Sequence, residues 1–173
     1  VIGPNAEDFR IMGGGSSSLK PHYIATPMTA LQDKLTGTEI VSALGCATHK
    51  YIPEPARGLV SPGTDSNARG LFGQFFADDL DSEIIAERVI GPATIHIAGR
   101  ASNAGAARFT GHYSVTESGS YEFGLLSTGQ ARMYIDDKLI IDNWDDTEPG
   151  EAFFTQATSE RRATIGCAAG DQV

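Results

Sequence analysis

Residues 109–144, FTGHYSVTESGSYEFGLLSTGQARMYIDDKLIIDNW, decide the fold. The pattern predicts β-strands at residues 111–115, 121–126, 132–135 and 139–141, joined by turns. Within the third strand the side chains alternate between two faces, with Met133 and Ile135 on one and Arg132 and Tyr134 on the other. The adjacent acids Asp136 and Asp137, between two apolar runs, are typical of a hairpin turn. This stretch therefore predicts an antiparallel β-sandwich.

The first 50 residues predict a different architecture. An apolar strand at residues 1–6, VIGPNA, leads into a loop rich in Gly and Ser, and Pro27 then opens a helix. Its apolar residues Met28, Leu31 and Leu35 fall at helical spacing, and Gly37 ends it. A second short strand follows at residues 39–46. Strand, loop, helix and strand in this order predict part of an α/β-sandwich domain with a parallel sheet.

The remaining segments complete the predicted organisation. Residues 51–67 are rich in Pro, Gly and Ser without a sustained period, which predicts a linker. Residues 68–173 would form the β-sandwich, with strands within 70–79, 82–99 and 161–170 and a long acidic loop at 145–160. The chain begins on a strand and ends without a cap or polar tail. We expect it to be a piece of a longer protein whose β-domain is incomplete at its C-terminal end.

Composition and charge exclude some functions. The 173 residues carry a formal net charge of −9, whereas nucleic acids and acidic membranes attract clustered Lys and Arg. No run of apolar residues approaches a membrane span. The two cysteines, Cys46 and Cys167, and four scattered histidines do not form a zinc spacing. We therefore expect neither a nucleic-acid partner nor a membrane, and we assign no metal ligand. The two thiols are expected to be buried or idle, and the alternative is a disulfide.

A glycine-rich loop is the first candidate site. Gly13, Gly14 and Gly15 are followed by three serines, beginning with Ser16. Neither GxGxxG nor GxxxxGK[ST] is present, so a nucleotide site is not indicated. The loop is either a place where the backbone approaches a neutral polyol such as a sugar, or an ordinary surface loop.

Acidic pairs and an aromatic pair are the other candidates. Asp78-Asp79, Asp136-Asp137 and Asp145-Asp146 could offer oxygen ligands to calcium, but a D-x-D-x-D-G loop is absent. The alternative for these pairs is a hairpin tip or a solvated surface. Phe153 and Phe154 lie in a polar loop, where rings can stack on sugar faces. The alternative is that one of the two rings anchors the loop to the core.

Two stretches together resemble known proteins. VIGPNA, GGGSSSL and YIATPMTAL resemble the α/β-sandwich domain of family three glycoside hydrolases, which include fungal and bacterial β-glucosidases. RGLFGQFF and the stretch 107–144 resemble the protective-antigen-type (PA14-like) β-domain of carbohydrate-active proteins. In one β-glucosidase subgroup that domain is inserted within the α/β-sandwich domain. The order of the motifs here is the same, and the resemblance covers nearly the whole chain.

The resemblance implies a retaining mechanism with two carboxylates held about 5–5.5 Å apart. The nucleophilic Asp would belong to a barrel domain and the acid/base Glu to a part of the α/β domain, both outside this sequence. We therefore assign no catalytic residue here. The resemblance gives two groups of substrate-binding candidates, which are Gly13, Gly14, Gly15 and Ser16, and Phe153 and Phe154. Asp137 is a departure, because the subgroup more often has Gly there.

The leading hypothesis is part of a β-glucosidase that hydrolyses terminal non-reducing β-D-glucosyl residues without a cofactor, with the β-domain shaping the substrate cleft. The partner is then a β-glucoside or oligosaccharide substrate, and the chain alone should be inactive. One alternative is a stand-alone carbohydrate-binding or adhesin module that depends on calcium. Another is an insert that only stabilises the enzyme or a homo-oligomer. Oligomeric state, aglycone preference and compartment, intracellular or secreted, do not follow from the residues.

Overall fold

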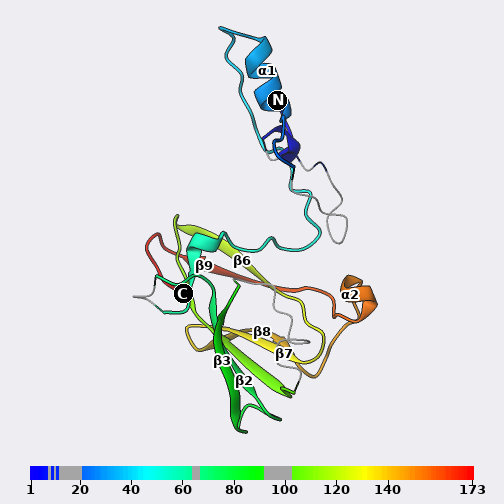
Figure 1. Cartoon of the computed structure of the whole chain (residues 1–173), viewed down its shortest axis with the longest axis vertical. Helices are drawn as coiled ribbons and strands as arrows, with labels where there is room; N and C mark the ends of the chain where they lie inside the picture. The colour runs from blue at the N-terminus through cyan, green and yellow to red at the C-terminus, as the bar shows by residue number, and fades with distance from the viewer. Residues whose placement is uncertain (8, 10, 12–20, 64–66, 92–102) are drawn as a thin grey trace. The chain divides into compact units, whose positions relative to one another are not determined.

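The computed structural model describes residues 1–7, 9, 11, 21–63, 67–91 and 103–173. The chain divides into two compact units, Val1–Lys50 and Tyr51–Val173. Figure 1 shows the helix of the first unit and the strands of the second. The two units are described separately below.

The α-helix predicted in the first unit is present. The 3-10 helix η1 (Pro4–Ala6) lies near the start, and α1 (Pro27–Lys34) follows. Thr26 caps α1, since its hydroxyl oxygen accepts a hydrogen bond from the Thr29 amide at 3.1 Å. Proline suits the first turn because its missing N–H has no partner to lose there.

The two strands predicted in the first unit are wrong in extent. In the described residues they are reduced to one isolated parallel bridge, between Ile2 and Ala43. Pro4 cannot donate to a strand ladder and instead begins η1. Parallel strands are also stable only when both faces of the sheet are covered, and Ile2 is 80% exposed here. A complete α/β-sandwich domain stays a prediction.

The second unit is built from antiparallel strands, as the sequence predicts (Figure 1). Their order along the chain is β1 (Val60–Ser61), β2 (Leu71–Phe76), β3 (Ile84–Ile90), β4 (Ala106–Thr110), β5 (His112–Tyr113), β6 (Gly119–Leu125), β7 (Ala131–Ile135), β8 (Lys138–Asn143) and β9 (Arg161–Cys167). β2 lies between β3 and β4. The other strands form three pairs, which are β1 with β5, β6 with β9, and β7 with β8.

Aromatic side chains form much of the core of this unit. Phe75 on β2 is 1% exposed and meets the Phe109 ring edge-on, with centroids 5.8 Å apart. Tyr113 meets Phe123 in the same geometry, with 6.3 Å between centroids. Such contacts stabilise a core beyond the burial of their area. Ile141 on β8 is also buried, which fixes the inner face of the β7–β8 hairpin.

Two segments differ from the sequence-based expectation, and a third cannot be compared. Residues 51–67, predicted as a linker, contain the 3-10 helix η3 (Arg57–Leu59) and β1, because Val60 buries its side chain and pairs with Tyr113. The acidic loop contains a short helix, α2 (Ala152–Thr155). The alternation at residues 94–98 lies outside the described residues.

The hairpin between β7 and β8 is confirmed. Ile135 pairs with Lys138, so Asp136 and Asp137 are the two turn residues. Both have left-handed backbone, with φ of 48° and 62°. Positive φ at both central residues matches the right-handed twist of the flanking strands. β8, the second strand of this hairpin, is followed directly by the segment that carries the candidate site.

Candidate functional site

The segment between β8 and β9, residues 144–160, presents an aromatic ring to solvent. We call it the β8–β9 loop. Phe154 lies in it and is 96% exposed. Phe154 and Thr155 both have left-handed backbone, with φ of 57° and 66°. An aromatic and a β-branched residue are poorly suited to this conformation, and such strain persists only where the surrounding structure imposes it.

The base of the β8–β9 loop is closed by main-chain hydrogen bonds. We call this base the neck. The Gly150 amide donates to the Ala157 carbonyl at 2.8 Å, and the Ser159 amide donates to the Glu148 carbonyl at 2.7 Å. The two sides of the neck are so close that a Cβ on Gly150 would overlap the carbonyl oxygen of Thr158. The neck therefore requires glycine at this position.

A buried polar cluster joins the neck to the sheet. Asn143, the last residue of β8, is 0% exposed. Its Nδ2 donates at 2.9 Å both to the Ser127 hydroxyl and to the Thr158 hydroxyl. The Thr158 amide donates to the Ser127 carbonyl at 2.8 Å. Three separate segments therefore meet at this one side chain.

The burial of Asn143 leaves one of its side-chain atoms without a hydrogen bond in the described part of the chain. Its Oδ1 is buried and has no hydrogen-bond partner among the described residues. A buried oxygen left without a partner costs roughly 1–3 kcal/mol. The two bonds that Nδ2 makes across the neck offset this loss.

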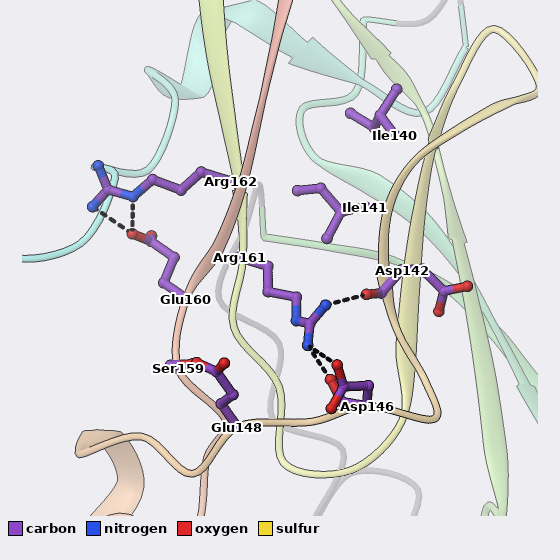
Figure 2. Close-up of a pocket in the computed structure, with 9 residues that line it drawn as sticks. All are labelled: Ile140, Ile141, Asp142, Asp146, Glu148, Ser159, Glu160, Arg161 and Arg162. Carbon is purple, nitrogen blue, oxygen red and sulfur yellow. Dashed lines mark hydrogen bonds and ion pairs between the residues drawn. The ribbon is translucent and has the colours of Figure 1, made fainter.

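A polar groove of about 450 Å³ lies beside the two ends of the β8–β9 loop. Figure 2 shows Arg161 of β9 reaching into it toward Asp142 and Asp146. The guanidinium donates through Nη1 to the Asp142 carbonyl at 3.2 Å and through Nη2 to the Asp146 carbonyl. The Asp146 carboxylate lies 3.7 Å from Nη2 but is 97% exposed, so the ion pair itself contributes little. Arg161 mainly holds the start of the loop by its carbonyl groups.

Arg162, the second arginine of the groove, connects β9 to β6. Arg162 pairs with Glu160 at 2.6 Å and with Glu122 of β6 at 3.4 Å. Glu160 also accepts a hydrogen bond from the Ile52 amide at 2.8 Å. Both guanidinium groups thus already have carboxylate or carbonyl partners. The groove offers oxygen acceptors to hydroxyl groups rather than a free cation to an anionic ligand.

Most of the predicted substrate-binding residues cannot be placed. Gly13, Gly14, Gly15, Ser16 and the Phe153 side chain lie outside the part that the structure describes. Of the predicted substrate-binding side chains, the structure describes that of Phe154, which is exposed to solvent.

The acidic pairs do not assemble a metal site in the described residues. Asp136 and Asp137 form the hairpin tip, and Asp146 points to solvent. No group of three or more His, Cys, Asp or Glu there could hold a metal ion. Cys46 is exposed, Cys167 is buried, and both are free thiols. No helix in the described ranges is long and apolar enough to cross a membrane.

Among the described residues, the pKa values of Tyr113 and Arg132 are shifted, and neither residue belongs to the β8–β9 loop. Burial raises the pKa of Tyr113, with further contributions from Tyr121 and Cys167. The hydrogen bond to Asp142 raises the pKa of Arg132, whose Nε lies 3.2 Å from each carboxylate oxygen. Both shifts preserve the ordinary charge state at neutral pH. They support packing and an ion pair rather than proton transfer.

Sequence reasoning missed the residues that hold the loop. Asn143, Ser127, Thr158 and Arg161 were not candidates, since their partners are distant in sequence. One signal was available for Asn143. The β8 alternation that buries Ile141 places residue 143 on the same inner face, where a polar side chain needs a partner.

Comparison with known families identifies the second unit. The PA14 domain family matches residues 86–173. The chain belongs to the PA14 domain family. The match begins within β3 and includes the β7–β8 hairpin, the polar cluster and the β8–β9 loop. The predicted resemblance to a protective-antigen-type β-domain is confirmed.

β-Glucosidases match the chain over most of its length. Probable beta-glucosidase K of Aspergillus fumigatus is 30% identical over 95% of this chain and 22% of its own length. The beta-glucosidase of Rhizobium radiobacter is 30% identical over 97% of this chain and 20% of its own length. The PA14 chain thus spans about a fifth of these relatives.

A solved structure has a similar fold. The selenomethionine-labelled β-glucosidase of Kluyveromyces marxianus superposes with a TM-score of 0.73 at 27% identity, covering 99% of this chain and 22% of that one. A second crystal structure of that enzyme is a complex with glucose, with a TM-score of 0.69. The predicted likeness to β-glucosidases with an inserted PA14-type domain is therefore confirmed.

Proposed function

We propose that this chain is part of a retaining β-glucosidase that releases terminal non-reducing β-D-glucosyl residues, and that its PA14 unit shapes the substrate cleft. One observation carries the proposal. β-Glucosidases match 95–99% of the chain, and so include the first 50 residues as well as the PA14 unit. A domain shared only as a mobile binding module would give a match limited to the second unit.

The catalytic carboxylates belong to other parts of the whole protein. Retention requires one carboxylate to attack the anomeric carbon and another to protonate the leaving oxygen, about 5–5.5 Å apart. The acids of the groove have other roles, because Asp142 pairs with Arg132 and Glu160 pairs with Arg162. The isolated chain is accordingly inactive, and the reaction needs no cofactor. Detectable turnover by the purified 173-residue chain would contradict this assignment.

Phe154 is the residue proposed to contact sugar from this chain. Its ring is exposed, and the apolar face of a pyranose matches an aromatic ring. We place the contact with a sugar beyond the scissile bond, because the β-domain would overhang the cleft rather than contain its reacting groups. Phe153 and the loop formed by Gly13, Gly14, Gly15 and Ser16 remain proposed members of the same substrate site.

Hydrolysis of an aryl β-glucoside by the whole protein that carries this chain tests the activity. Hydrolysis with retention of anomeric configuration, followed by NMR, is the expected result. A folded whole protein without hydrolysis would remove the proposal. Phe154→Ala, compared with the surface control Asn67→Ala, then tests the role of the PA14 unit. We expect KM for β-linked oligosaccharides to rise in Phe154→Ala alone.

Calorimetry of the 173-residue chain with glucans separates a sugar-binding module from a part of an enzyme. As part of a cleft, the chain alone contributes only some of the sugar contacts and binds glucans too weakly to measure. Tight binding that is lost when calcium is removed would instead favour a stand-alone module.

A further inference from the structure

We propose that Asn143 is a positioning residue that fixes where Phe154 is presented, and thereby sets the preference of the enzyme for longer substrates. This inference rests on the proposed function, because it assigns a structural determinant to the same sugar contact. Asn143 itself touches no substrate. It acts through Thr158 and the neck of the β8–β9 loop.

The polar cluster fixes the far end of the loop. Asn143 lies at the end of β8, so its position is set by the pairing of that strand with β7. Its Nδ2 holds the hydroxyl groups of Ser127 and Thr158 at the same distance, 2.9 Å. Thr158 is only four residues from Phe154, and it is 7% exposed. The buried Asn143 side chain thus connects the end of β8 to Thr158, which follows the tip of the loop.

The neck transmits this position to the tip. The Ala157 amide donates to the Ala152 carbonyl at 3.2 Å, which closes α2 against the residue next to Thr158. The Gly150 amide donates to the Ala157 carbonyl from the other side. Phe154 lies between these closures and has no burial of its own to hold it. Its place is therefore determined by the neck rather than by core contacts.

The start of the loop has an anchor of its own, so Asn143 does not hold both ends of the loop. Arg161 holds the Asp146 carbonyl from β9 (Figure 2). The two ends of the loop are consequently fixed by different strands, β8 through Asn143 and β9 through Arg161. Loss of Asn143 should leave the start of the loop in place and loosen the neck at Thr158, whose hydroxyl then loses its partner on β8.

A double-mutant cycle in the whole protein tests the inference. The readout is KM for a β-linked glucose oligosaccharide. Phe154→Ala and Asn143→Ala should each raise KM by roughly 2- to 12-fold, the range of one aromatic contact. The double variant should have the same KM as Phe154→Ala, because Asn143 acts only through the contact that this change already removes. In Asn143→Ala, kcat for an aryl β-glucoside should stay within about twofold of the parent.

The contradicting outcome is a double variant whose KM rises by the product of the two single effects. This would mean that Asn143 acts independently of Phe154. Ser127→Ala removes one acceptor of the cluster and keeps the inference testable where Asn143→Ala folds poorly. It should raise KM in the same direction, and an unchanged KM in folded Ser127→Ala would count against the inference.

Amide hydrogen exchange separates this inference from the sugar contact. Asn143→Ala should accelerate exchange at Gly150 and Thr158, whereas the surface control Asn67→Ala should not. Unaltered exchange at the neck in Asn143→Ala would overturn the inference whatever the kinetics. An unchanged KM in Phe154→Ala would instead overturn the sugar contact, and exchange at the neck would still decide whether Asn143 positions the loop.

Discussion

Two places in the PA14 unit put consecutive non-glycine residues in left-handed backbone, and their surroundings differ. Asp136 and Asp137, with φ of 48° and 62°, form the tip of a hairpin whose strands pair on both sides. Phe154 and Thr155, with φ of 57° and 66°, lie at the tip of the β8–β9 loop. Aspartate tolerates this conformation and a two-residue hairpin needs it. Phenylalanine and threonine tolerate it poorly.

The difference indicates why each conformation is present. Hairpin geometry explains the Asp136-Asp137 turn without any function. No such geometry explains Phe154, whose ring is 96% exposed and gains nothing from the core. Strain at an exposed aromatic residue, with a buried polar cluster below it, is more typical of a ligand contact. Four substitutions break or sharpen this comparison.

Gly150→Ala should have the largest effect on stability. Its new Cβ would overlap the Thr158 carbonyl, which forces the neck apart. We expect a loss of about 1–3 kcal/mol in the free energy of unfolding, measured by urea denaturation of the 173-residue chain. The matched control is Gly166→Ala on β9, where a Cβ meets open space. Equal losses in both variants would show that the neck is not a close approach.

Arg161→Ala should have the next largest effect. It removes two bonds to the carbonyl groups of Asp142 and Asp146, and we expect a loss of about 1–2 kcal/mol by the same denaturation. Arg132→Ala is the control beside the hairpin, where we expect a smaller loss because solvent screens the part-exposed ion pair with Asp142. A larger loss in Arg132→Ala than in Arg161→Ala would contradict the anchoring of the loop.

Phe154→Gly should stabilise the chain by about 0.5–1 kcal/mol. Glycine adopts positive φ without strain, and little buried area is lost. The midpoint of thermal unfolding should rise by a few degrees while the KM of the whole protein for oligosaccharides increases. A lower midpoint would show that the Phe154 ring supports the fold.

Asp137→Gly should have the smallest effect, a gain of about 0.5 kcal/mol in the same thermal measurement. It relieves the same kind of backbone strain at a residue that tolerates it better. Activity of the whole protein should not change, because the hairpin tip has no proposed role. A change in KM would contradict the claim that the hairpin tip has no role in substrate binding.

Features that depend on neighbouring residues could be predicted from the sequence. The β7–β8 hairpin followed from local information, since alternation and an acidic pair determine both strands and turn. Phe154 was a candidate because an aromatic pair in a polar loop is unusual. Its exposure was not predictable, because either ring of the pair could have entered the core.

Other features depend on partners that are far apart in the sequence. Asn143, Ser127 and Thr158 meet only once three segments are folded, and no local pattern connects them. The strands predicted in the first 50 residues are reduced to one bridge, between Ile2 and Ala43. Parallel strands depend on covering layers and neighbouring strands rather than on their own residues. A strand at Val60 was missed because its surroundings resemble a linker.

The most direct test compares the KM of the whole protein for a β-linked glucose disaccharide in Phe154→Gly and in Asp137→Gly. Both variants relieve left-handed backbone in the same unit, so stability changes in the same direction. We predict a rise in KM of roughly 2- to 12-fold for Phe154→Gly, the range of one aromatic contact, and none for Asp137→Gly. Equal KM values in the two variants and the parent would contradict the claim that the β8–β9 loop of this PA14 domain contacts the substrate.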